Sequence, residues 1–355
     1  MLDKKMLITG LFFSLVFTFI LFYFFIDFSK LISILMHANL FYVLISLSFY
    51  LLSLYLRSKR WGYLLQEQLT NSSKSILPVV IFGYMANNLI PVRIGEFLRS
   101  YYLSIRENIS SSFAFGTIII ERLMDVFALI IFFSIGALTG SFFNSSDFDD
   151  FSNSVPGGKK TMVFLSLFPF LILSAIIIIY TQLSQNKIKI ILNKLLFLFS
   201  DKIRDLIVNK FLLLFEGLTS ILKKNTFIYT LLFSLMIWTC EALMYYIISI
   251  GLNLDTFFDS GLEHVSIIIV FTSVVNLAGI IPSTAGSWGP FDFFGSITLI
   301  TLGVSNEVAV AYSLLVHVAL WLPPTLLGFV IIILDQKTIK KVIKNFRSQK
   351  ISYVE

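Results

Sequence analysis

The sequence predicts an all-α, polytopic membrane protein with about six full spans and two re-entrant helical hairpins that enter from opposite faces. Hydrophobic residues make up 57% of the chain and charged residues only 14%, more apolar surface than a soluble domain of this length can bury. The apolar runs are continuous, which favours helices over the alternating strands of a barrel. Two further runs are too short to cross and stop at a proline.

Six apolar segments are long enough to span a membrane, for which about 20 residues are needed. The first follows Lys4 and Lys5, is longer than the core of a signal peptide and lacks a small-residue cleavage site, so we expect it to be retained as an anchor. The second is followed by Arg57, Lys59 and Arg60, which we interpret as part of a cytoplasmic loop. The six segments are residues 6–26, 38–56, 113–140, 161–182, 227–251 and 307–334.

The first predicted hairpin enters from the cytoplasmic side. Residues 76–90 are apolar but too short to cross. The chain breaks between Pro91 and Gly95, two residues that interrupt a helix, and returns over residues 96–105. Broken backbone at membrane depth is tolerated only where protein or a water-filled cavity surrounds it. The break therefore predicts a polar site inside the protein.

The second predicted hairpin enters from the outside. Residues 265–281 form a short apolar segment, residues 282–292 a Pro- and Gly-containing break, and residues 293–302 a short return. The same pattern thus occurs twice, from opposite faces. Such an arrangement is typical of transporters that build a midplane site from discontinuous helices.

The distribution of basic residues orients the chain. On the predicted inner side lie 22 Lys or Arg residues and on the outer side 3, a split that places both termini in the cytoplasm. Residues 185–225 are basic with an apolar face, which predicts an amphipathic helix on the inner leaflet. We therefore expect one transmembrane domain over residues 1–335, a basic cytoplasmic tail over residues 336–355, and residence in the cell membrane. The net charge of +6 reports orientation here, and we expect no nucleic-acid partner.

Charged side chains cluster beside the first break. Arg93, Glu96 and Arg99 are three residues apart, so a helix carries them along one side. The predicted third span carries Glu121, Arg122 and Asp125. Ionisable groups at membrane depth must be paired or hydrated, which favours Arg93 with Glu121 or Asp125, and Arg122 with Glu96. Either these pairs only fasten the hairpin to the span, or at least one arginine remains to bind an anionic headgroup.

The second break offers a different set of groups. Hydroxyls at Ser283 and Thr284 and backbone N–H groups at Gly286 and Gly289 could receive an anion near a half-helix N-terminus. The alternative is a glycine-rich kink needed only for close packing. Asp292 lies near a helix start, where the helix dipole stabilises an acid equally well.

Two more ionisable residues lie within predicted spans. Glu241 is either a proton-coupling group or the partner of an arginine, and His317 is either a packing histidine with hydrogen bonds or a proton relay. No metal or cofactor motif and no nucleotide-binding P-loop is present in the sequence, so we expect no cofactor and no ATP hydrolysis by this chain.

Three motifs resemble the membrane region of the lysylphosphatidylglycerol synthase family, a group of flippase-like integral membrane proteins. They are P-V-R-I-G-E-F-L-R-S-Y-Y, then I-I-I-E-R-L-M-D-V-F, then I-P-S-T-A-G-S-W-G-P-F-D, and the resemblance covers about residues 6–335. The family usually has Gly-Gly-x-Gly and then Glu in the last motif, where this chain has Ala-Gly-Ser-Trp-Gly and Asp292. By position, the resemblance implies roles for Pro91, Arg93, Gly95, Glu96, Glu121, Arg122, Asp125, Pro282, Gly286, Gly289 and Asp292.

The resemblance implies a domain that moves or presents a lipid. The soluble lysyltransferase domain of the two-part members has no counterpart here, so we expect no enzyme activity. The leading hypothesis is a lipid translocase, not driven by ATP, for an anionic or aminoacylated phospholipid or a polyprenyl-phosphate lipid. The alternative is an accessory subunit that holds a lipid for a partner lipid-modifying enzyme or glycosyltransferase. That enzyme and a second copy of the chain are the possible protein partners.

Overall fold

The computed structural model describes residues 4–25, 27–66, 68–69, 76–91, 94–139, 185–196, 201–222, 225–279 and 285–351. Over these residues the secondary structure is helical, and no strand is present in them. The expected all-α class therefore holds for the described chain. The expected span at residues 161–182 lies outside it, as do Arg93, Pro282, Ser283 and Thr284.

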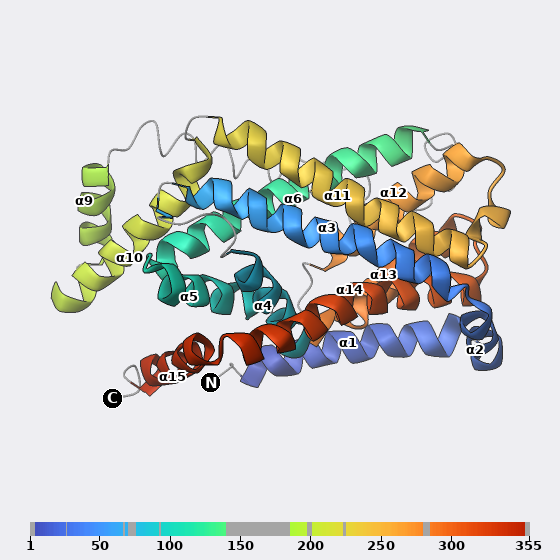
Figure 1. Cartoon of the computed structure of the whole chain (residues 1–355), viewed down its shortest axis with the longest axis horizontal. Helices are drawn as coiled ribbons and strands as arrows, with labels where there is room; N and C mark the ends of the chain where they lie inside the picture. Colours follow the sequence, from blue (N-terminus) through green and yellow to red (C-terminus); the bar gives the residue numbers. More distant parts are fainter. Residues whose placement is uncertain are drawn as a thin grey trace.

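Long helices run side by side along the long axis of the molecule (Figure 1). Four of those described are long and apolar enough to cross a membrane: α3 (Leu40–Leu65), α11 (Thr226–Gly251), α12 (Gly261–Ala278) and α14 (Asn306–Leu334). α1 (Lys4–Phe25) and α6 (Ser111–Thr139) have 22 and 29 residues. α3 and α11 share the most extensive contact among the described helices.

Short elements close the two ends of the bundle. At one end lie α2 (Phe28–His37) and the 3₁₀ turn η4 (Leu254–Phe257), beside the connection from α11 to α12 (Figure 1). The other end holds both chain termini, together with three α-helices and a 3₁₀ turn of the described chain. These are α9 (Gln185–Leu195), α10 (Asp201–Thr219), the 3₁₀ turn η3 (Ser220–Leu222) and α15 (Gln336–Ile351).

The first predicted break is present as two short helices, α4 (Ile76–Leu89) and α5 (Gly95–Glu107). The two helices fold back on each other, and Gly95 makes this possible. A Cβ atom at that position would lie 2.1 Å from the carbonyl oxygen of Gly83, well inside van der Waals contact. A glycine at residue 95 therefore sets the spacing of the hairpin.

The second break separates α12 from α13 (Pro290–Thr301), with the 3₁₀ turn η5 (Ala285–Ser287) between them. Gly286 and Gly289 have φ values of +75° and +97°, a region that side chains with a Cβ rarely adopt. The two helix pairs lie toward opposite ends of the bundle (Figure 1), and α4 contacts η5.

Two expected helix boundaries need correction. α3 does not end at residue 56 but continues to Leu65, so Arg57 and Arg60 belong to a buried helix and not to a loop. α12 begins at Gly261, because the Ser260 hydroxyl accepts a hydrogen bond from the backbone N–H of Glu263 and caps the helix. With 18 residues it reaches the length of a candidate span.

The basic segment at residues 185–225 is not one surface helix. It contains two α-helices, α9 and α10, and α10 packs against α6 at a contact of two glycines. A Cβ on Gly217 would lie 2.2 Å from the carbonyl oxygen of Phe113, and one on Gly116 would lie 2.3 Å from that of Leu214. α10 is thus partly a member of the bundle, although Ile203 and Leu206 on its apolar side remain exposed.

Candidate functional site

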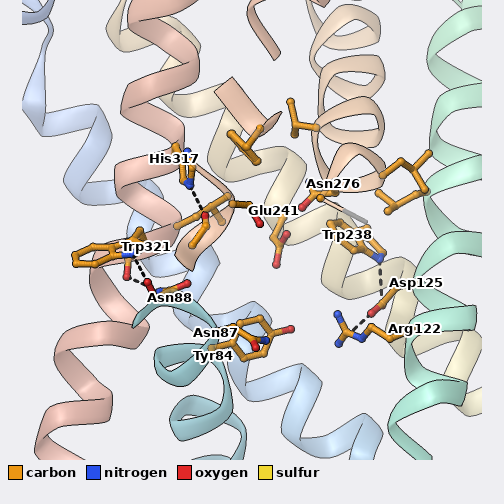
Figure 2. A pocket seen from close by; sticks show the side chains of 18 of the residues that line it. Tyr84, Asn87, Asn88, Arg122, Asp125, Trp238, Glu241, Asn276, His317 and Trp321 are labelled. Atoms are coloured by element: carbon orange, nitrogen blue, oxygen red, sulfur yellow. Dashed lines mark hydrogen bonds and ion pairs between the residues drawn. The ribbon is translucent and has the colours of Figure 1, made fainter. Parts of the chain in front are cut away.

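A cavity of about 400 Å³ lies where the two helix breaks meet (Figure 2). His317 and Trp321 of α14 lie on one side, Arg122 and Asp125 of α6 on the other, and Glu241 of α11 between them. Both breaks also contribute to its wall. The further lining residues are Tyr50, Arg57, Tyr84, Asn87, Asn88, Glu96, Val126, Leu129, Trp238, Val275, Asn276, Leu277, Gly279, Gly286, Ser287, Phe291 and Leu320.

Five charged side chains line this cavity, and they are joined by ion pairs. Arg57 pairs with Glu241 and lies 3.7 Å from an Asp125 oxygen. Arg122 lies 3.3 Å from Asp125 and 3.6 Å from Glu96. The pair of Arg122 with Glu96 is the one that the sequence predicts. It joins the start of α5 to α6 across the cavity wall.

A second set of charges lies behind this wall and is buried. Glu121 on α6 accepts hydrogen bonds from Arg99 of α5 and from Arg60 of α3, the latter at 3.4 Å. Arg60 also reaches Asp125, with its second contact at 3.2 Å. The Arg99 guanidinium lies 4.3 Å from the ring centre of Trp61, within the range of a cation–π contact. Removing any one of these groups would leave an uncompensated charge in the interior.

Not every polar atom in the cluster is satisfied. Among the described residues, Nε and Nη1 of Arg57 and Nε of Arg122 have no hydrogen-bond partner, and the Tyr84 hydroxyl and Asn87 Oδ1 have none either. Buried polar groups in proteins are nearly always hydrogen-bonded. All four residues line the cavity, although these particular atoms are buried.

The second break is held by a buried histidine and aspartate. Nδ1 of His317 lies 2.9 Å from Oδ1 of Asp292, and Nε2 lies 2.7 Å from the carbonyl oxygen of Gly286. The other Asp292 oxygen accepts a hydrogen bond of 3.1 Å from the Gly289 N–H. The ring of Trp288 stacks on His317 with 4.1 Å between ring centres.

Hydrogen bonds in both directions link the end of α4 to α14. The Asn88 side-chain nitrogen, at the end of α4, donates to the carbonyl oxygen of Trp321 at 2.9 Å and to the Thr325 hydroxyl at 3.0 Å. The indole nitrogen of Trp321 donates back to the Asn88 carbonyl oxygen at 3.2 Å. Trp321 also contacts Gly286, since a Cβ there would lie 2.9 Å from its ring.

The predicted site residues that the structure describes fall into three groups. Glu96, Arg122, Asp125, Gly286, Glu241 and His317 line the cavity. Arg99, Glu121 and Asp292 lie behind it in contacts with lining residues or with each other. Gly289 packs on α1, where a Cβ would lie 2.7 Å from the Ser14 carbonyl oxygen. Of the two interpretations of Glu241, the described contacts include the one in which it is the partner of an arginine, Arg57.

Sequence reasoning missed Arg57 and Arg60 as members of the cluster. They follow an apolar run and look like the charges that mark a membrane boundary. A usable signal was present, because the predicted third span carries two carboxylates against one arginine, and Arg57 and Arg60 are three residues apart on one helix. Trp238 was missed as well, although its indole nitrogen donates to Asp125 at 3.2 Å.

Comparisons with known proteins agree with this architecture. The sequence matches the family described as "Lysylphosphatidylglycerol synthase TM region" over residues 8–328. UPF0104 membrane protein MJ1595 of Methanocaldococcus jannaschii is 27% identical over 328 residues, which cover 89% of this chain and 91% of the relative. UPF0104 membrane protein PH1989 of Pyrococcus horikoshii is 23% identical over 327 residues, covering 87% and 91%. The comparison with solved structures finds no match.

Proposed function

Because the chain belongs to the family of lysylphosphatidylglycerol synthase transmembrane regions, and because two broken helix pairs meet at a charged cavity, we propose that it moves lipid headgroups across the membrane without ATP. The observation that carries the proposal is the presence of two arginines, Arg57 and Arg122, in the cavity wall, each with at least one N–H group that has no hydrogen-bond partner. Guanidinium groups bind phosphate oxygens strongly and with defined geometry. The headgroup phosphate would take these donors.

The cavity fits a headgroup better than a whole lipid. Its volume of about 400 Å³ is at the small end of the range of ligand pockets, so the acyl or prenyl chains would remain in the surrounding bilayer. The carboxylates of Glu96 and Glu241 stand beside the arginines and could receive a cationic amino group. We therefore propose an anionic or aminoacylated phospholipid, or a polyprenyl-phosphate lipid, as the substrate class.

We also propose the orientation of the chain in the cell membrane. The two hairpins would enter from opposite faces, alongside six full spans, with both termini in the cytoplasm. The end of the bundle that holds the termini also carries the basic helices α9 and α15, and α10 with three further Lys or Arg residues (Figure 1), which supports this orientation because cytoplasmic ends are rich in Lys and Arg. The headgroup would then lie between the hairpin tips.

A leaflet-exchange assay tests the proposal. Protein reconstituted in liposomes should accelerate the exchange of lipids that carry a fluorescent headgroup. Arg57→Lys keeps the positive charge opposite Glu241 but removes the free guanidinium donors. We expect it to lower the exchange rate about tenfold, as expected for the loss of one or two charge-assisted hydrogen bonds.

Arg60→Lys is the matched control. It is the same substitution three residues further along α3, at a position with similar carboxylate partners that does not line the cavity. At equal amounts of folded protein its exchange rate should stay near that of the wild type. No acceleration by the wild type over empty liposomes would refute the proposal. Bound lipid without any exchange would instead favour a protein that presents lipid to a partner enzyme.

We further propose that the lipid leaves chemically unchanged. The groups that line the cavity are held in ion pairs that suit binding and positioning. Mass spectrometry of the lipids recovered from the same liposomes tests this point, and a new lipid species formed only with active protein would contradict it.

A further inference from the structure

The contacts of His317 determine how many protons it shares with Asp292. Its Nε2 lies 2.7 Å from the carbonyl oxygen of Gly286, which can only accept a hydrogen bond, so Nε2 must carry a hydrogen. Its Nδ1 lies 2.9 Å from a carboxylate oxygen of Asp292. A neutral imidazole with its hydrogen on Nε2 has a lone pair on Nδ1, which would face a lone pair of an ionised carboxylate.

One additional proton resolves this conflict. It can sit on Nδ1, giving an imidazolium beside a carboxylate, or on Asp292, giving a neutral histidine beside a carboxylic acid. In both forms the pair has no net charge and both hydrogen bonds are made. From these contacts we infer that His317 and Asp292 form a buried proton-binding site, and that the bound proton fastens the second helix break in its closed conformation.

The proton holds backbone as well as side chains. His317 binds the carbonyl oxygen of Gly286, and Asp292 binds the N–H of Gly289. Both glycines have positive φ values. The His317–Asp292 pair thus binds the backbone at both ends of the described part of the break. Without the proton, the lone pairs of Nδ1 and the carboxylate would repel each other, and the hold on Gly286 would weaken.

Other charged groups around the cavity compensate one another. The charged residues that line it with His317 are Arg57 on α3, Glu96 on α5, Arg122 and Asp125 on α6, and Glu241 on α11, and each is in an ion pair within that group. α12 contributes only uncharged lining residues, and Asp292 on α13 is the charged group in contact with the ring. No arginine of this group is therefore left to neutralise an ionised Asp292 in place of the bound proton.

The site has a route to the cavity and to the first break. His317 lines the cavity, and Trp321, one helical turn further along α14, contacts Gly286 and exchanges hydrogen bonds with Asn88 at the end of α4. Release of the proton would thus loosen the contact between the two breaks. That this loosening opens the lipid path rests on the proposed function.

Cysteine labelling can detect this opening without lipid transport. The single native thiol, Cys240, is replaced by serine, and Ser287→Cys places a thiol in the break at the cavity wall. Thr256→Cys, on the exposed turn η4, measures the pH dependence of the reagent itself. The ratio of the two labelling rates is measured from pH 5 to 9, which brackets the usual range of histidine titration.

The wild-type pair should give a ratio that rises about tenfold with pH, as expected when an open state populated to 10% or less becomes the main one. Asp292→Asn mimics the protonated pair, because its amide donates to Nδ1 while its oxygen still accepts from Gly289. Its ratio should stay low at every pH. His317→Leu removes both hydrogen bonds and should give a high ratio throughout.

Two results would overturn the inference: a wild-type ratio that does not change with pH, or a ratio that rises equally in Asp292→Asn. Size-exclusion profiles of the variants establish that they are folded. Lipid exchange measured on the same preparations separates the two proposals. A flat ratio with normal exchange removes the proton site alone, whereas a pH-dependent ratio without exchange removes the proposed function alone.

Discussion

The two helix breaks border one cavity, yet they are held in different ways. The break between α4 and α5 is held by ion pairs to another helix, from Arg99 to Glu121 and from Glu96 to Arg122. The break between α12 and α13 is held by a histidine–aspartate pair that binds the backbone of the break itself. The first is fastened by charges that are fixed in their pairs, and the second by groups that can gain or lose a proton.

This difference indicates that the two breaks have different roles in the site. A break fastened through several helices moves only if the surrounding bundle moves. A break fastened by one local pair can change while the bundle stays in place. In the proposed function, the first hairpin would provide the binding charges and the second would act as the movable part. The following predictions test this comparison, starting with the largest expected effect.

The strongest test of the first break is Glu121→Ala. The substitution leaves Arg60 and Arg99 buried without their shared carboxylate, and breaking a buried ion pair in this way costs about 3–5 kcal/mol. We expect a large loss of folded protein, measured by thermal unfolding of the protein in detergent. Asp255→Asn, an exposed carboxylate in η4, should change little. An unfolding midpoint for Glu121→Ala close to that of the control would contradict the ascribed role of the ion pairs.

Glycine substitutions compare the two breaks by steric fit. Gly95→Ala brings a Cβ against the backbone of Gly83, and overpacking of this kind costs about 1–3 kcal/mol. Gly286→Ala must adopt a positive φ, at about 1–2 kcal/mol, and brings a Cβ to 2.9 Å from the Trp321 ring. Gly261→Ala, with no atom within 4 Å, is the control. Cysteine labelling at residue 287 should rise with Gly286→Ala but not with Gly95→Ala, and the opposite order would contradict the separation of the two breaks.

The link between the breaks is expected to have a smaller effect. Asn88→Ala removes the hydrogen bonds to the Trp321 carbonyl oxygen and to Thr325. A typical net contribution of a hydrogen bond is about 1 kcal/mol, so unfolding should occur at slightly lower temperature. If Asn88 couples the hairpins, cysteine labelling at residue 287 should still depend on pH in Asn88→Ala. The effect of pH on the lipid-exchange rate should become smaller. Unchanged stability and exchange would show that the link is dispensable.

The smallest effect concerns the part of α5 that lies away from the break. The Tyr102 hydroxyl donates to Asp335 at 2.6 Å. Burial acts to raise the pKa of Asp335, but hydrogen bonds from Thr338 and Tyr102 and the charge of Arg106 hold it below its usual value. The contact thus stabilises the fold above the ordinary aspartate pKa, near 4, and this stabilisation is lost as the pH falls through the lowered value.

Tyr102→Phe should therefore lower stability by about 0.5–1.5 kcal/mol near neutral pH. The difference from the wild type should shrink at about pH 4 and below. Unfolding in denaturant at several pH values measures it. A difference that grows on acidification would have the wrong sign for an ionised Asp335 and would disprove the assigned contact.

Much of the fold could be predicted because helix breakers act locally. Pro91 and Gly95 interrupt a helix wherever they occur in one, and the described hairpin breaks between Leu89 and Gly95. The pair of Arg122 and Glu96 could be predicted because a charge within an apolar run needs a partner. These inferences need only neighbouring residues and a general cost of burying charge.

The remaining features depend on contacts between distant parts of the chain. Arg57 is buried because Glu241 lies 184 residues later, and Arg60 because Asp125 lies 65 residues later. Nothing beside Arg57 in the sequence distinguishes it from a boundary charge. The start of α12 differs, because the Ser260–Glu263 capping pattern was present in the sequence and would have placed the helix correctly.

The arginines of α3 also have a consequence for how the protein is made. A ribosome that adds about 5–20 residues per second needs roughly 10–40 s to pass from Arg57 to Glu241. During that interval Arg57 of α3 lacks Glu241, one of its two carboxylate partners. α3 therefore cannot reach its final packing as an independent unit. Its final position depends on contact with α11, which is synthesised later. A chain released before Glu241 should thus be recognised as unfinished, however many apolar segments it has already inserted.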